Sequence, residues 1–544
     1  MPETILILTI LIPIVGSAIL PFVGLLDKRL RNALAFCLVF ASFCLSLTML
    51  PRIYSGEQIV FFRQFPLGLN LSFTADALAV FMAAVSSLIS SIIVFYSFGY
   101  VSHYEHQTEY YSMVTLFLGS MMGLVFSSNL ILIYIFWELT AICSWRLIGF
   151  FREKNYVMRA DKAFLMTVFG ALLMLAGFLL VYQQTGSFDL SSIKNNLNGG
   201  PVSNLTVLFI LVGILSKSAT LPFQSWLPDA GVAPSPVTAL LHAAVLVKIG
   251  VYVFARLFVF TFNIDQIWHT VVPVIAALSA IVSAGCALVE TDIKRIIAYS
   301  TISQIAFIFL GLSTNAIIGI AGGLLYILMH GISKAGLFLC AGIVEQNTKI
   351  KDITKLGGLI KTMPLTAISF LLCAFSVMGI PPFGGFFSKY MVFASAVTSG
   401  HMLINFVFLI GAFMTVLYLV RLFNLVFMGQ GQGNLPREGS HSMIAAVLIL
   451  GILSFASGIF VYYPFKIAQL SVLNLAGLSD TQINMAKPWL NADRLSSGMP
   501  LYRENFDGKF SRSITEPIGR QPKDSEGGMD VEKSRVLVRR NSFK

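Results

Sequence analysis

Seven ionisable side chains stand well inside long apolar stretches of this sequence. They are Glu138, Lys217, His242, Lys248, His330, Lys334 and Lys389. If those stretches cross a bilayer, each buried charge costs about 2.5–3.5 kcal/mol on insertion scales, unless the group is paired, hydrated or neutral. A purely structural role for all seven would be expensive. We therefore interpret them as residues that carry out chemistry.

The residue types suit proton transfer. Burial weakens the hold of a lysine on its proton, and a nearby carboxylate strengthens it again. A glutamate that approaches or recedes can thus switch a lysine between its two states. Histidine titrates near neutrality and relays protons between neighbours. Alternating Lys, His and Glu on adjacent helices would form a proton wire, although a hydrogen-bonded packing role is the alternative for any single histidine.

Spacing along the chain indicates which of these groups share a helix face. His330 and Lys334 are four residues apart and face the same way on a helix. His242 and Lys248 are six residues apart, which is about 9 Å along a regular helix and not on one face. We expect a bridging water between the second pair.

Membrane-spanning elements must hold these side chains. Of the 544 residues, 56% are hydrophobic and 12% are charged, about half the charged fraction of a soluble domain. Runs such as 163–182 and 443–463 are long enough to cross a bilayer. They lack the alternation of a barrel strand, so helices are the expected spanning structure. No basic residue precedes the first span, which favours a retained helix over a cleaved signal peptide.

We predict an all-α membrane protein with about fourteen spans. They run approximately over residues 3–25, 31–50, 74–98, 111–128, 130–150, 163–182, 203–221, 235–259, 268–288, 293–312, 316–344, 364–397, 402–428 and 443–463.

Two of these spans contain helix breakers. Pro222 interrupts the seventh, and Gly379, Pro381, Pro382 and Gly384 interrupt the twelfth. Proline removes a helical donor, and a Pro-Pro pair flanked by glycines breaks a helix more surely than one proline does. Broken helices at membrane depth line polar cavities, and a pair of them in two halves of a chain suggests an inverted-repeat transporter. A mere kink is the alternative at each place.

Loop charge predicts the orientation. The basic segments 27–31, 152–162, 292–295 and 349–361 fall on one side of the membrane if the count is right. The positive-inside rule makes that side cytoplasmic and places both termini outside. Residues 466–544 hold no spanning run, and we expect a polar, basic extension that is flexible or lies on the surface.

The sequence offers no motif for a cofactor. All six cysteines lie in apolar runs and none forms a CxxC pair, so we expect neither a disulfide framework nor an iron–sulfur site. We find no phosphate loop and no dinucleotide fingerprint. We therefore expect this chain to bind no cofactor or metal. Its net charge of +11 reflects loops of a membrane protein rather than nucleic-acid binding.

Several motifs together resemble a known family. They are FWEL at 136–139, KSA at 217–219, WLPDA at 226–230, PSPVTALLHAA at 234–244, DIKRIIAYSTISQ at 292–304, HGISKA at 330–335 and GIPPFGGFFSK at 379–389. These look like the antiporter-like subunits of respiratory complex I. That family includes Mrp-type sodium/proton antiporters and membrane-bound hydrogenases. The resemblance covers roughly 70–460.

The resemblance implies an organisation of the chain. It implies fourteen core helices with broken helices seven and twelve, and two inverted five-helix repeats. The regions would be 1–110 (helices one to three), 111–259 (first repeat), 260–428 (second repeat), 429–465 (helix fourteen) and 466–544 (the tail). The location would be an energy-transducing membrane, bacterial or archaeal.

The resemblance also implies roles and partners. Glu138 would pair with Lys217, and protons would pass by His242 and Lys248 through His330 and Lys334. Lys389 would be the lysine on the exit side, where some family members carry Glu. Partners would be other membrane subunits, including homologous antiporter-like ones, together with peripheral redox subunits and lipid.

Three functions stay open from the sequence. The first is a proton-translocating subunit of a redox-driven complex, either of the NADH:quinone type or linked to ferredoxin or hydrogenase. The second is a subunit of a multisubunit Na⁺/H⁺ antiporter. The third is a haem-bearing electron-transfer protein that uses His242 and His330, which a visible spectrum without a Soret band would eliminate.

Overall fold

The computed structural model describes residues 2–64, 70–429 and 437–473, and helices dominate it. Twelve helical segments in the described part are long and apolar enough to cross a membrane. Eleven are α1 (Pro2–Leu26), α2 (Lys28–Tyr54), α3 (Ala77–Tyr100), α4 (Gln107–Phe126), α5 (Leu130–Ile148), α6 (Lys154–Thr185), α12 (Trp268–Val289), α13 (Ile293–Ser313), α14 (Ile317–Thr348), α17 (Met402–Phe427) and α18 (His441–Ile459). The predicted all-α membrane class is confirmed.

The twelfth segment, Ser235–Val259, is not one regular helix. It comprises α10 (Ser235–Ala239), a π-helical turn Leu240–Ala244, α11 (Leu246–Phe254) and a second π-helical turn Ala255–Val259. Single π turns inside helices are uncommon and concentrate at functional sites. The regular helix predicted for this span is therefore wrong.

The two remaining predicted spans are interrupted. The first leaves the helical path when α8 (Asn204–Lys217) ends, and a short helix α9 (Trp226–Asp229) follows the break. The second consists of α15 (Pro364–Met378) and α16 (Gly384–Thr398). Gly379 between them has φ +83°, which favours glycine. Each break contains one cis peptide bond, before Pro222 and before Pro382.

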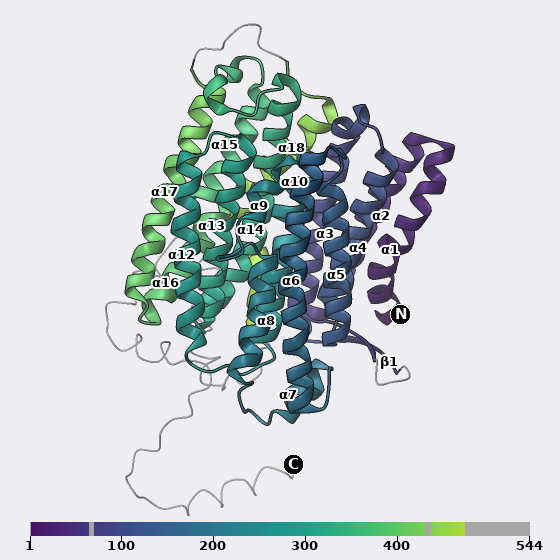
Figure 1. The fold of residues 1–544 in the computed structure, drawn as a ribbon, viewed down its shortest axis with the longest axis vertical. Helices are drawn as coiled ribbons and strands as arrows, with labels where there is room; N and C mark the ends of the chain where they lie inside the picture. The colour runs from purple at the N-terminus through teal and green to yellow at the C-terminus, as the bar shows by residue number, and fades with distance from the viewer. Residues whose placement is uncertain (1, 65–69, 430–436, 474–544) are drawn as a thin grey trace, which may run out of the picture.

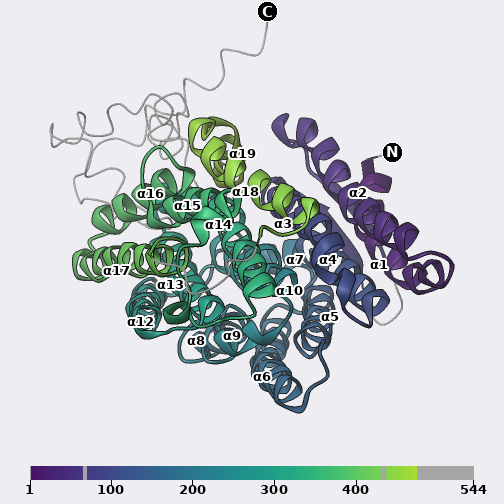
Figure 2. The same cartoon turned by 90° about the horizontal axis from the view of Figure 1, so that it is seen from above.

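Helix α14 lies near the middle of the bundle, and α1 with α2 and α12 with α17 lie at opposite edges (Figure 2). The neighbours of α14 include α13, α15, α16, α18 and α10. Ile317–Thr348 is 94% buried over its apolar window, whereas the α1 window is 39% buried. Ionisable residues on α14 are therefore held away from lipid by other helices.

The predicted basic loops gather at one end of the bundle, where ion pairs link them. Lys162 and Arg295 come from two of these segments, and both pair with Asp229, at 2.7 and 3.4 Å. Helix α13 begins at this end because Asp292 accepts hydrogen bonds from the backbone N–H groups of Lys294 and Arg295. The common side predicted for these segments agrees with this arrangement.

The opposite end carries a short hairpin and a short helix (Figure 1). Strands β1 (Ile59–Arg63) and β2 (Leu71–Ala75) pair antiparallel, and α7 (Leu190–Asn196) lies at the same end. The sequence predicts neither element, because alternation over five residues is a weak signal and α7 is only seven residues long.

Helix α19 (Tyr462–Leu473) corrects the predicted start of the polar extension at residue 466. It packs against α14 and α3. The reason is an apolar stripe at helical spacing, since Phe465, Ala468 and Val472 are all fully buried. The rest of the predicted extension, 474–544, lies outside the described residues.

A largely buried ion pair stabilises the first half of the bundle. Arg256 donates to Asp76 through both terminal nitrogens, and its Nε lies 3.0 Å from the Tyr252 hydroxyl. Asp76 also caps α3 by accepting from the backbone N–H of Ala79. Burial raises the pKa of the Asp76 carboxyl, but the Arg256 guanidinium and these hydrogen bonds hold it below its usual range.

We predict that Arg256→Gln lowers the stability of the purified protein by about 3–5 kcal/mol, because it leaves a buried carboxylate without its partner. The measurement is the thermal unfolding midpoint in detergent. The same pairing makes stability fall with acid: with a lowered folded pKa, its contribution is present above the unfolded pKa and is lost as pH falls through the folded value. Arg52→Gln is the matched control, since the Arg52–Glu57 pair is exposed and should contribute little. Equal midpoints for the two variants would contradict the prediction.

Candidate functional site

His330 and Lys334 stand one turn apart on α14, with 1% and 0% of their surface exposed. They form the centre of the candidate site, and the predicted shared face is consistent with this placement. His330 lies within electrostatic range of four other predicted residues, namely Lys248, Lys334, His242 and Lys389. The structure therefore brings five of the seven predicted groups into one buried neighbourhood.

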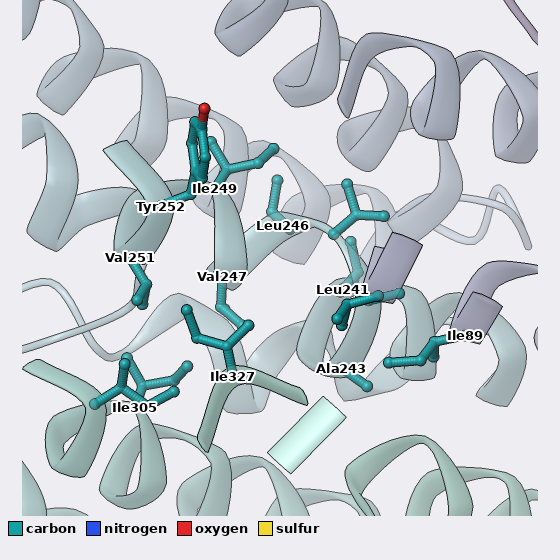
Figure 3. Packing of buried hydrophobic residues seen from close by; sticks show 14 of the residues in the cluster. Ile89, Leu241, Ala243, Leu246, Val247, Ile249, Val251, Tyr252, Ile305 and Ile327 are labelled. Atoms are coloured by element: carbon teal, nitrogen blue, oxygen red, sulfur yellow. The ribbon is translucent and has the colours of Figure 1, made fainter. Parts of the chain in front are cut away.

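Lys248 on α11 contacts His330 directly. Its Nζ lies 2.7 Å from His330 Nδ1, and Lys248 is fully buried. The neighbouring residues Val247 and Ile249 belong to dense apolar packing, in which Val247 approaches Ile327 of α14 (Figure 3). Among the described residues, His330 Nδ1 is the hydrogen-bond partner of Lys248 Nζ, so the imidazole is the group with which the lysine can share a proton.

The His242 side chain makes no hydrogen bond to Lys248 or to any other described residue. It sits in the π-helical turn before α11, and its ring centroid is 4.4 Å from that of Phe338. Neither ring nitrogen has a hydrogen-bond partner among the described residues. The π turn and the irregular backbone at Val245 (φ −124°, ψ −74°) change the rise and rotation between His242 and Lys248. The spacing of about 9 Å expected for a regular helix therefore does not apply.

Lys334 begins a polar network that the sequence analysis missed. Its Nζ donates to Ser300 Oγ at 2.5 Å, and the Tyr418 hydroxyl lies 2.6 Å from the same oxygen. Tyr418 is also 3.3 Å from Thr415 Oγ1, to which Gln304 Nε2 donates at 3.2 Å. All of these side chains are fully buried.

The network leads to Lys389. The Tyr326 hydroxyl donates to Gln304 Oε1 at 2.5 Å, and Lys389 Nζ lies 5.7 Å from the centroid of the Tyr326 ring. Lys389 itself donates to the Val377 carbonyl at 2.6 Å, across the break between α15 and α16. A signal for part of this network was available, because Ser300 and Gln304 are spaced four apart on α13 and share a face.

Glu138 and Lys217 form the other part of the site. Lys217 is the last residue of α8 and is fully buried, and its Nζ donates to the Trp137 carbonyl at 3.0 Å. Glu138 is partly buried, and its Oε1 has no hydrogen-bond partner among the described residues. The two charges interact through space. However, no ion pair within 4.0 Å joins them in the part of the chain that the structure describes. The ion pair implied by the family resemblance is therefore not formed in this conformation.

Taken together, the site holds four buried lysines and two buried histidines, with one carboxylate at its edge. A row of like charges is unfavourable at this depth, so these groups cannot all be protonated at once. Hydroxyl and amide groups span the distance from Lys334 toward Lys389, and such groups can pass protons. No group of three or more His, Cys, Asp or Glu side chains suited to a metal ion occurs among the described residues.

Two family profiles match this chain. A family profile described as "NADH:quinone oxidoreductase/Mrp antiporter, TM" matches residues 127–415. A second profile, "NADH-Ubiquinone oxidoreductase (complex I), chain 5 N-terminus", matches residues 63–111. The two matches include every predicted proton-transfer residue.

Among individual relatives, NADH-quinone oxidoreductase subunit L of Campylobacter jejuni is 34% identical over 82% of this chain and 73% of its own length. Na(+)/H(+) antiporter subunit A1 of Staphylococcus haemolyticus is 31% identical over 83% of this chain. The match spans 60% of that antiporter subunit, so this chain corresponds to less than two thirds of it.

Two solved structures share the fold. The chain superposes on one in the Mrp complex from Dietzia sp. DQ12-45-1b with a TM-score of 0.80 and 20% identity, over 91% of this chain and 99% of the other. It superposes on one in the membrane-bound sulfane sulfur reductase, an archaeal respiratory membrane complex, with a TM-score of 0.79 and 22% identity, over 86% and 97%.

Proposed function

Because the chain belongs to the family of membrane subunits found in NADH:quinone oxidoreductases and Mrp antiporters, we propose that this integral membrane protein moves protons through its buried Lys, His and Glu residues. The observation that carries the proposal is the contact of 2.7 Å between Lys248 and His330. It joins two helices at full burial and involves no carboxylate. Two positive charges at this distance repel each other, so the two groups are not both protonated at once. One nitrogen can therefore accept a proton from the other, which proton transfer requires.

The proposed path runs along α14. A proton shared by Lys248 and His330 passes to Lys334 one turn away, and His242 supplies a further exchange site beside them. From Lys334 the proton passes through Ser300, Tyr418, Thr415 and Gln304 toward Tyr326. Lys389 receives it at the second break. The polar contacts of 2.5–3.3 Å described above support this path from Lys334 to Tyr326.

Glu138 and Lys217 act as the switch in this proposal. When Glu138 approaches Lys217, the ammonium form of the lysine is favoured, and when it recedes the proton is released. Support comes from the unpartnered Glu138 Oε1 and from the through-space coupling of the two groups. The broken helices, including Pro222 in the first and Gly379, Pro381, Pro382 and Gly384 in the second, would allow the half-helices to shift. The two inverted five-helix repeats stay a prediction.

The energy source that drives proton movement determines which partner subunits the chain needs. We propose that the chain works in a multisubunit membrane complex beside homologous antiporter-like subunits, within lipid. Redox centres, where present, would reside on peripheral subunits, and this chain would bind no cofactor. Similarity to subunit L and to the sulfane sulfur reductase favours a redox-driven complex. Similarity to the antiporter subunits and to the Mrp complex favours Na⁺/H⁺ exchange as the second candidate.

One experiment separates the two. The native complex is purified by a tag on this chain, its subunits are identified by mass spectrometry, and it is reconstituted in vesicles that enclose a pH-sensitive dye. We expect an electron donor to acidify or alkalinise the lumen, with a rate that Na⁺ gradients do not alter. Proton movement driven by a Na⁺ gradient alone would support the antiporter instead. If neither drives protons in a complex that retains all its subunits, the proposed function is wrong.

A further inference from the structure

A charged cavity of about 590 Å³ opens at the basic end of the bundle, between the α1–α2 turn and the α3–α4 loop. Its lining includes Lys28, Arg31, Glu105, His106 and Glu109. None of these residues takes part in the proton path. The cavity therefore needs its own explanation.

Arg31 is the unusual member of this lining, because it is buried without a counter-charge. Only 2% of its surface is exposed. Its guanidinium donates to neutral oxygens of Asn32, Thr108 and Gln107 at 2.7–3.1 Å, and it lies 5.1 Å from the centroid of the Tyr111 ring. No carboxylate lies within 4.0 Å of it in the described part of the chain. A buried charge that lacks an opposite charge is costly.

The acidic residues of the cavity do not supply that charge. Glu109 pairs with both Arg146 and Arg152, so it is already neutralised by groups outside the lining. Glu105 is exposed, and it is a single carboxylate in a lining that also holds Lys28 and Arg31. The cavity is therefore basic on balance, with Arg31 held rigidly at its wall.

An apolar surface begins beside this cavity. On α1, Val15, Ile19, Phe22 and Leu26 recur at spacings of three and four residues and are 52%, 46%, 71% and 82% exposed. The spacing places them on one stripe of the helix. The stripe ends one residue before Asp27, which caps α2 directly ahead of Lys28. An anionic group with apolar chains would match both features.

We propose that this cavity binds the phosphate headgroup of an anionic phospholipid through Arg31 and Lys28, with an acyl chain along the exposed stripe of α1. Charge complementarity at the wall selects the anion, and the apolar stripe selects a lipid over a free anion. This site is independent of the proton path. It would anchor α1 and α2, which form one edge of the bundle (Figure 2).

The test uses the purified complex washed in detergent and then incubated with phosphatidylglycerol, with phosphatidylcholine or with inorganic phosphate. Retained lipid is counted by native mass spectrometry, and stabilisation by each lipid and by phosphate is followed as a shift in the thermal midpoint. We expect wild type to retain phosphatidylglycerol over phosphatidylcholine. Lys28→Gln should weaken that retention about 5-fold, since one basic residue near an anionic surface contributes about 1 kcal/mol. Arg31→Gln should weaken it further.

Lys28 is exposed, so Lys28→Gln tests the site without disturbing the fold. The matched control is Lys361→Gln, which removes an exposed lysine from a loop at the same end outside the cavity. Unchanged retention in Lys28→Gln would overturn the proposal, and so would equal losses in Lys28→Gln and Lys361→Gln. Stabilisation by inorganic phosphate that matches that by phosphatidylglycerol would overturn the assignment to lipid.

Discussion

Lys248→Ala is expected to abolish proton movement while the complex still assembles. The substitution removes the ammonium that lies 2.7 Å from His330 Nδ1, and no other described side chain donates to that nitrogen. A positioned proton donor or acceptor contributes on the order of 100-fold to 10,000-fold in rate. We therefore expect the proton flux, measured with the pH dye in reconstituted vesicles, to fall by at least about 100-fold.

Two further variants distinguish proton exchange at Lys248 from other effects of the substitution. Lys248→Arg keeps the positive charge but holds its proton under all ordinary conditions, so we expect the same loss, which separates proton exchange from mere charge. Lys194→Ala is the matched control, because it makes the same chemical change at a lysine on α7, outside the bundle core, whose Nζ donates to the Phe260 carbonyl. Flux above half of the wild-type value in Lys248→Ala would contradict a path through this residue.

Glu138→Gln and Lys217→Ala are expected to have the second largest effect. Each removes one partner of the proposed switch, so we expect the driven flux to fall about 10-fold or more in either variant, with subunit composition unchanged. Since the two groups act on one another, the double variant should be no slower than the slower single variant. Independent residues would instead give multiplied losses.

The control for this second prediction is Glu153→Gln, an exposed glutamate at the start of α6. It makes the same chemical change outside the bundle core and should leave the flux intact. Unchanged flux in both Glu138→Gln and Lys217→Ala would contradict the proposed switch. Losses that multiply in the double variant would show that the two residues act separately.

The spans were predictable because each depends on a local property, namely a long apolar run that must form its own hydrogen bonds. The two breaks were predictable for a similar reason, since Pro222 and the Pro381–Pro382 pair cannot donate within a helix. The buried lysines could also be found, because a charge within an apolar run is visible without any knowledge of the fold.

Other features depend on contacts between distant segments. The pairing of Lys248 with His330 joins residues 82 positions apart, and the Asp76–Arg256 pair joins residues 180 apart. The π turn at Leu240–Ala244 has no signal in its composition, because Leu, His and Ala all suit a regular helix. In the sequence, nothing distinguishes Tyr418 from any other tyrosine on a membrane helix. Its place in the network depends on α17 packing beside Ser300. Tertiary packing decided each of these.

Three of the four buried lysines of the site share an arrangement that affects the energetic cost of each proton step. Lys217, Lys334 and Lys389 donate to the main-chain carbonyls of Trp137, Ile297 and Val377. A carbonyl carries no net charge, and a neutral amine still has hydrogens to donate to it. Each lysine can therefore lose its proton without leaving a stranded anion and without giving up its hydrogen bond. The scaffold need not reorganise at every proton step, and large movements can be reserved for the Glu138–Lys217 pair.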